Sequence, residues 1–263
     1  MAVEKLKSPL KDKPLRNPGE SLDKQIFDLV FDGALIYLVI SMLMVSMAMI
    51  EWHHWYFKAP PSPWISSLIA LITVSYSAVK INRTLKKAKY LKQGRDGEKA
   101  VGQYLENLRE NGAKVFHDIP GDNFNLDHVV ICQSGLYVIE TKTYSKPDKG
   151  EAKIIFNGDA IFLNGKIKVD KPIIQVRAAS KWLNDLILEL TGLKLTVKPV
   201  IVFPGWFIEP TSEAKNSEVW VLNPKALPTF IGNSKEQLSV EQVRMVSGHL
   251  GRYVRRFEDK KAK

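Results

Sequence analysis

The sequence predicts an α/β domain that is preceded by a hairpin of two membrane-spanning helices. Two stretches without charged side chains, 33–50 and 64–79, lie in the first third of the chain. Further on, short runs that are rich in Val and Ile and apolar on both faces alternate with segments whose apolar residues recur at helical spacing. Strands of this kind are typical of a sheet that helices cover on each side.

The composition indicates which kinds of partner the protein can have. A formal net charge of +10 and a pI near 9.5 suit a polyanionic partner, an anionic membrane surface, or both. The single cysteine, Cys132, lies inside a predicted core strand and is interpreted as a packing residue. One cysteine excludes a disulfide framework and a cysteine-based zinc site.

The predicted membrane hairpin spans residues 33–80 and follows a tail, 1–32. The first apolar run is long enough to cross a hydrocarbon layer, which needs about 20 residues. The aromatic sequence WHHWYF and then PPSP follow it, as expected for an interfacial belt and a turn. The second run is shorter, so it either spans a thinned bilayer or is re-entrant.

Lys and Arg residues predict the orientation of this hairpin. They are frequent in the tail and in a basic linker, 81–94, whereas the loop between the two apolar runs has only Lys58. Both flanks are therefore expected in the cytoplasm, with the hairpin in the cytoplasmic membrane of a prokaryote. The linker cations bind lipid headgroups, extend a nucleic-acid surface, or form only the positive flank of the helix.

The segments DHVVIC and GLYVIETK predict a β-hairpin that brings two carboxylates and a lysine together. Side chains alternate along a strand, so Glu140 and Lys142 share one face, and pairing about the turn places Asp127 near their level. We expect Asp127, Glu140 and the Thr141 carbonyl to bind Mg²⁺ or Mn²⁺. Lys142 would orient the attacking water or help to deprotonate it. The alternative is a purely structural ion pair at the strand ends.

The elements around this hairpin supply further candidates. A helix over 96–111 places Glu98 at the start of its apolar stripe, where the acid either lies near the metal site or only stabilises the helix N-terminus. A strand over 114–119 and a polar loop over 120–125 come next. His128 faces away from Asp127 and is expected to pack or to support the site, whereas no role is assigned to His117.

The second half of the predicted domain begins with a hairpin over 152–163. A helix over 172–190 then carries Gln175 in its first turn, within reach of the strand ends. Arg177 and Lys181 lie on its more exposed side, as weak candidates for phosphate contacts or as solvated surface. Strands over 197–203 and 218–222 complete the domain, and a helical extension covers 223–263.

The pattern D-H-V-V-I-C-x-x-G-L-Y-V-I-E-T-K resembles the core of the NERD (nuclease-related) domain, a branch of the PD-(D/E)xK nuclease superfamily. GRDGEKAV, from Gly94, resembles the opening helix of that family, and IIQVRAA resembles its later helix with a Gln. The resemblance covers about 94–204 and implies a restriction-endonuclease-like core, with a mixed central sheet flanked by helices, over 95–222. It implies catalytic roles for the following residues: Glu98, Asp127, Glu140, Lys142 and Gln175.

The expected function is that of a membrane-anchored, Mg²⁺-dependent nuclease that acts on nucleic acid, with DNA placed ahead of RNA. By the same resemblance its products carry a 5′-phosphate. The alternative is a membrane-tethered module that binds nucleic acid or a protein without hydrolysis. A third interpretation makes the two apolar runs a soluble helical hairpin.

Overall fold

The computed structural model describes residues 15–57, 63–121, 123–147 and 150–261, and the side chains up to Phe257. The chain divides into two compact units, of which one is Ser21–Arg95 and the other combines the residues before and after it. The first 14 residues of the predicted tail lie outside the described residues.

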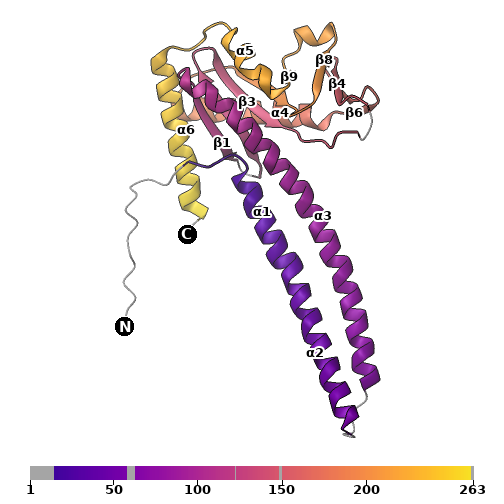
Figure 1. Ribbon diagram of the computed structural model, residues 1–263. Helices are drawn as coiled ribbons and strands as arrows, with labels where there is room; N and C mark the ends of the chain where they lie inside the picture. Colours follow the sequence, from indigo (N-terminus) through magenta and orange to yellow (C-terminus); the bar gives the residue numbers. More distant parts are fainter. Residues whose placement is uncertain (1–14, 58–62, 122, 148–149, 262–263) are drawn as a thin grey trace, which may run out of the picture. The chain divides into compact units, whose positions relative to one another are not determined.

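The unit Ser21–Arg95 consists of long helices. Helix α1 (Glu20–Val30) continues through a π-helical turn, η1 (Phe31–Leu35), into α2 (Ile36–Tyr56), and α3 begins at Pro63. The Trp52 indole donates a hydrogen bond to the Ser67 hydroxyl at 2.7 Å, and the Thr84 hydroxyl donates to the Gly33 carbonyl at 3.4 Å. These contacts pair α2 and the first part of α3 as antiparallel neighbours (Figure 1).

Both helical segments of this unit are long and apolar enough to cross a membrane. The most apolar windows of Glu20–Tyr56 and Pro63–Glu110 have mean hydropathies of 2.3 and 1.5, and only 6% and 11% of each window is buried. Large apolar side chains such as Met42 and Leu71 are exposed on them. The structure therefore contains the two apolar helices that the sequence predicts.

Helix α3 extends without interruption from Pro63 to Glu110. The prediction that a new helix starts at Asp96 is wrong, since the basic stretch 81–94 is itself helical. The physical reason is that this stretch has no proline, and that its four Lys and two Leu are good helix formers. The end is as predicted: the helix stops before Gly112, which has a φ of 85°.

A mixed five-stranded sheet forms the centre of the second unit. Its order is β1-β2-β3-β7-β9, with antiparallel pairing from β1 to β3 and parallel pairing from β3 to β9. The strands are β1 (Lys114–Pro120), β2 (Asn125–Cys132), β3 (Gly135–Thr141), β7 (Val197–Val202) and β9 (Trp220–Leu222).

Helices cover both faces of this sheet. Val101, Leu105 and Leu108 of α3 pack on one face, with Ile139 and Val200. On the other face lie α4 (Lys171–Thr191) and α6 (Val240–Lys261). The predicted α/β class, with a mixed central sheet flanked by helices, is confirmed.

A second, four-stranded sheet has the order β6-β5-β4-β8. The predicted hairpin is present as β4 (Lys153–Phe156) and β5 (Ile161–Leu163), followed by β6 (Ile167–Val169). Strand β8 (Phe207–Pro210) was not predicted, because it is short and its strand conformation comes from pairing in parallel with β4.

Short helices complete the second unit. After β8 come η2 (Glu213–Asn216), η3 (Pro224–Ala226) and α5 (Leu227–Gly232). The predicted C-terminal helix is interrupted between α5 and α6, because the Gln237 and Leu238 N–H groups donate to the Gln133 carbonyl instead of to a helical turn.

Candidate active site

The β2–β3 hairpin has the register that the sequence predicts. Cys132 pairs with Gly135 and His128 with Ile139, so continuing the register by one residue places Asp127 opposite Glu140. Gly135 has a φ of 131°, a conformation that favours glycine at this turn. The two carboxylates therefore lie side by side at the same end of the sheet.

A third carboxylate, which sequence reasoning missed, extends this row. In the β1–β2 pairing, His117 faces His128 and Ile119 faces Leu126, so Asp118 stands opposite Asp127. Its side chain is 2% exposed and accepts hydrogen bonds from Asn125 at 2.9 Å and from Arg16 at 3.3 Å. The only sequence signal was an acid inside an apolar strand, and its meaning depends on the β1–β2 register.

Lys142 neutralises part of this negative charge. Its ammonium donates to Glu140 Oε1 at 2.5 Å, in a partly buried ion pair. Burial lowers the pKa of Lys142, but the charges of Glu140 and Asp127 outweigh it and the net shift is upward. Lys142 is therefore protonated at neutral pH, so it suits charge stabilisation and orientation rather than proton abstraction.

Asp127 is partly buried and is held by the main chain of β3. Its Oδ2 accepts a 2.7 Å hydrogen bond from the Thr141 N–H, which fixes the carboxylate against the end of β3. Burial raises the pKa of Asp127 well above its usual value, and the charges of Glu140 and Glu98 raise it further. Two or more carboxylates at this point repel one another, and a cation would relieve that repulsion.

Glu98 reaches the same cluster from α3. Gly97 permits this approach, since a Cβ there would lie 2.0 Å from the Thr143 Cγ2, just after Lys142 in the chain. The Glu98 side chain is 8% exposed. Burial, then the charges of Asp118 and Glu140, raise its pKa to about 7. Of the two interpretations left open for Glu98, the structure favours a place in the site.

The residues present fit a hard divalent cation. Asp127, Glu140 and the Thr141 main chain supply oxygen atoms, which Mg²⁺ prefers, and Mg²⁺ usually keeps several waters. Within the described parts of the chain, no group of three or more His, Cys, Asp or Glu side chains stands ready to hold a metal ion. A site with two carboxylates agrees better with Mg²⁺ or Mn²⁺ than with a zinc centre of His and Cys.

Three other residues that were predicted to act at the site or to bind nucleic acid make no contact with this cluster among the interactions of the described residues. Gln175 is exposed near the start of α4, as its fifth residue, and none of the hydrogen bonds of the described residues links it to the acids. Arg177 is exposed and lies 3.8 Å from Asp159, and Lys181 is exposed. Their roles at the site and with nucleic acid stay predictions.

His117 and His128 form a separate pair beneath α3. Their Nδ1 atoms are 2.8 Å apart, and His117 Nε2 lies 3.5 Å from Glu106. Burial lowers the pKa of both rings, so they are neutral at pH 7. As the alternation of side chains predicts, His128 points away from Asp127 and is fully buried.

The raised pKa of Glu98 predicts a pH-dependent stability. The folded chain holds this proton up to about pH 7 and the unfolded chain only up to about 4.5. The contribution of protonated Glu98 to the free energy of unfolding is full below pH 4.5. It is lost as the pH rises to about 7, which lowers the free energy of unfolding by about 3 kcal/mol. The free energy of unfolding can be measured with urea, in detergent and EDTA, at pH 5 and at pH 8. Its fall between these two pH values should be smaller for Glu98→Gln than for the unsubstituted chain.

The control for this measurement is Glu189→Gln, at an exposed position of α4. It should keep the pH dependence of the unsubstituted chain. Equal falls in unfolding free energy for Glu98→Gln and the unsubstituted chain would contradict the assignment of the titration to Glu98.

Part of the chain, including this cluster, resembles a family of known proteins. Residues 93–204 match the family described as the nuclease-related domain, NERD. An uncharacterized protein of Bacillus anthracis is 34% identical over 71 residues, which are 25% of this chain and 34% of that protein. The chain thus spans about a third of the length of this curated relative.

Two solved structures show a weak likeness. Pyrococcus furiosus SfsA in complex with Ca²⁺ is 17% identical with a TM-score of 0.27, over 49% of this chain and 54% of that one. A Vibrio cholerae protein is 13% identical with a TM-score of 0.27, over 89% of this chain and 58% of that one. TM-scores this low support no argument, so the assignment depends on the family match and the site geometry. Residues 93–204 of this chain, which hold the acids and Lys142, are similar to the nuclease-related domain family.

Proposed function

We propose that this protein is a membrane-anchored nuclease that hydrolyses phosphodiester bonds of DNA or RNA with Mg²⁺ or Mn²⁺, on the cytoplasmic side of the membrane. The observation that carries the proposal is the convergence of Glu98, Asp127, Glu140 and Lys142 at one end of the central sheet. A binding module for a polyanion has no use for clustered carboxylates, since they repel phosphate.

Each side chain has a distinct task in this proposal. Asp127, Glu140 and the Thr141 carbonyl would hold the cation, which when bound would supply charge neutralisation on the phosphate and a more acidic water. Lys142 stays charged and stabilises the negative charge that develops on the phosphate oxygens. The water oxygen forms a bond to phosphorus and the bond to O3′ breaks. The departing O3′ takes a proton from a solvent water, which leaves a 5′-phosphate and a 3′-hydroxyl.

Glu98 is suited to receive the proton that the attacking water loses. Proton transfer is most efficient when the pKa of the acceptor lies near the working pH. The pKa of Glu98, about 7, meets this condition, and it does so because of burial and of the neighbouring acids Asp118 and Glu140. Glu98 then returns its proton to solvent.

The test uses the full chain in detergent micelles with plasmid, linear duplex DNA, single-stranded DNA and RNA. Each substrate is incubated with Mg²⁺, Mn²⁺ or EDTA, and the product ends are mapped. Cleavage in either metal, its loss in EDTA and 5′-phosphate ends are the expected results. Salt-sensitive binding without cleavage in any metal would overturn the proposal in favour of a non-catalytic module.

Membrane anchoring has a separate prediction. The chain should stay in the membrane pellet after alkaline carbonate washing and enter solution only with detergent, because its helices expose long apolar surfaces. Leu43→Arg with Leu71→Arg should lower the membrane fraction, since a charge at a helix centre costs about 3 kcal/mol. Leu43→Ala with Leu71→Ala is the matched control, and a soluble unsubstituted chain would contradict anchoring.

A further inference from the structure

An apolar groove lies at the edge of the central sheet where β7 and β9 end, and nothing in the proposed chemistry uses it. It has a volume of about 810 Å³. The residues that matter here line the groove and are called the aromatic groove below: Tyr104, Gly205, Trp206, Phe207, Lys225 and Phe230.

The aromatic groove and Lys142 lie at the same edge of the central sheet. Strands β3, β7 and β9 are parallel, so their carboxyl ends meet at one edge. The groove is lined by the segments that follow β7 and β9, and Lys142 directly follows β3. The Lys142 N–H donates to the Val202 carbonyl at 2.9 Å, which fixes this neighbourhood. Ligands of open α/β sheets typically bind at this edge.

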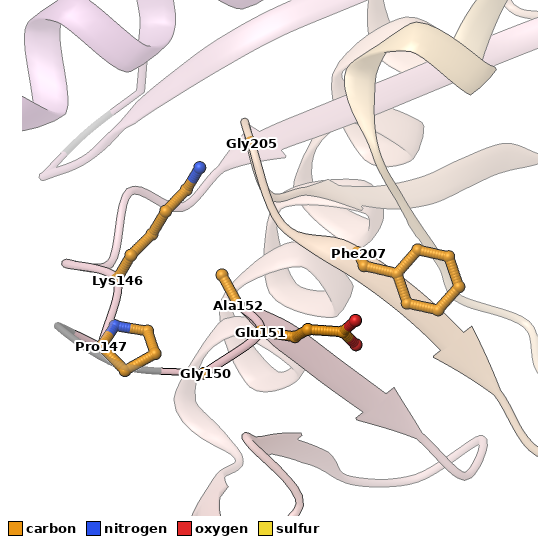
Figure 2. Close-up of a pocket in the computed structure, with 7 residues that line it drawn as sticks. All are labelled: Lys146, Pro147, Gly150, Glu151, Ala152, Gly205 and Phe207. Atoms are coloured by element: carbon orange, nitrogen blue, oxygen red, sulfur yellow. The ribbon is translucent and has the colours of Figure 1, made fainter.

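A second hollow, of about 550 Å³, shares Gly205 and Phe207 with the aromatic groove. Figure 2 shows Lys146, four residues after Lys142, with its ammonium directed toward Gly205. A Cβ on Gly205 would lie 3.0 Å from this ammonium, and Gly205 has a φ of 77°. One acid, Glu151, also lines the hollow. The two hollows therefore form a continuous surface. Lys146, which is close to Lys142 in the sequence, supplies a positive charge in the second hollow.

The aromatic rings of the groove are held on a fixed base. Trp206 is 2% exposed and its indole donates to the Tyr144 carbonyl at 3.3 Å. The Phe207 N–H donates to the Ala152 carbonyl at 2.8 Å, yet the ring of Phe207 is 64% exposed. Phe230 is 43% exposed and rests edge-on against Trp220 at 5.4 Å. Exposed rings on a rigid base can accept a flat ligand without rearrangement.

The groove has the charge that a polyanion needs. Lys225 is its charged residue, and no carboxylate is found among the described residues that line it. The Asn223 amide is already engaged, since it donates to the Trp206 carbonyl at 2.9 Å and accepts from the Lys225 N–H. The groove thus offers aromatic faces and positive charge but few hydrogen bonds that would read a particular base.

We propose that the aromatic groove binds unpaired bases of a single nucleic-acid strand, whose backbone continues past Lys146 to the phosphate cleaved at Lys142. This inference rests on the proposed nuclease function and names its substrate class, a single strand or an unpaired end. Base stacking on aromatic rings is tolerant of sequence. Bases inside a duplex are stacked on one another and present only their edges, so a duplex cannot fill the groove.

The experiment measures binding without hydrolysis. The full chain in detergent and EDTA is titrated into a dT oligonucleotide with one 2-aminopurine, whose fluorescence falls on stacking. Phe207→Ala and Phe230→Ala should each weaken binding about 5- to 150-fold and remove the fluorescence change. Ile167→Ala, an exposed apolar position of β6 outside the groove, is the control and should bind as the unsubstituted chain does.

The outcomes separate this inference from the proposed function. Binding of the dT oligonucleotide that Phe207→Ala and Phe230→Ala leave unchanged would overturn the inference, whether or not the chain cleaves nucleic acid. Groove-dependent binding without any metal-dependent cleavage would overturn the nuclease proposal, and with it the stated substrate class, while leaving a binding groove. With cleavage, single strands should be cut faster than blunt duplexes, and Phe207→Ala should reduce this preference.

Discussion

Lys142→Ala is expected to slow phosphodiester hydrolysis by about 10²- to 10³-fold, which is the usual effect of removing one group that stabilises charge in a transition state. The Lys142 ammonium donates a hydrogen bond directly to Glu140, and the raised pKa of Lys142 keeps it charged. Cleavage rates at saturating Mg²⁺, measured in detergent on the substrate that the unsubstituted chain cuts, provide the test.

The matched control for this prediction is Lys166→Ala, an exposed lysine in the turn between β5 and β6. It removes one positive charge far along the chain from the acids and should leave the rate unchanged. Lys142→Ala must also unfold at nearly the same temperature as the unsubstituted chain, so that a slow rate reports chemistry. A Lys142→Ala protein that is folded and cuts at the full rate would remove Lys142 from the mechanism.

Asp127→Asn is expected to have opposite effects on stability and activity. The carboxylate of Asp127 is unfavourable in the metal-free chain, because burial and then Glu140 and Glu98 raise its pKa. A carboxyl whose folded pKa is raised stabilises the fold at low pH, and that stability is lost as the pH rises. An amide cannot ionise, and its oxygen can still accept from the Thr141 N–H. At pH 8 in EDTA, Asp127→Asn should therefore unfold at a higher urea concentration.

The same substitution should lower cleavage by about 10²-fold or more, since it removes a charged oxygen ligand. It should also abolish the rise in unfolding temperature that Mg²⁺ gives to the unsubstituted chain. Asp185→Asn, at an exposed position of α4, is the control and should retain both the Mg²⁺ effect and the activity. A less stable Asp127→Asn protein at pH 8 would contradict the proposed repulsion among the carboxylates.

Some features of the fold could be predicted from the sequence because the residues that determine them are close together in the chain. The helix end at Gly112 and the turn before Gly135 both depend on glycine conformation, which acts within a few residues. Continuity of α3 through 81–94 was missed, because the charged linker looked like a boundary while its residues favour helix. The interruption before α6 was missed as well, since it depends on hydrogen bonds to the distant Gln133.

The sequence by itself determined the two apolar helices, the β2–β3 hairpin and the alignment of Asp127 with Glu140, because periodicity and turn chemistry fix these over short distances. Only the tertiary structure decided that Glu98 and Asp118 join them, since burial and charge at that point depend on how α3 and β1 meet the strand ends. The aromatic groove is likewise tertiary, because the segments after β7 and β9, which carry Phe207 and Phe230, meet Tyr104 of α3 there.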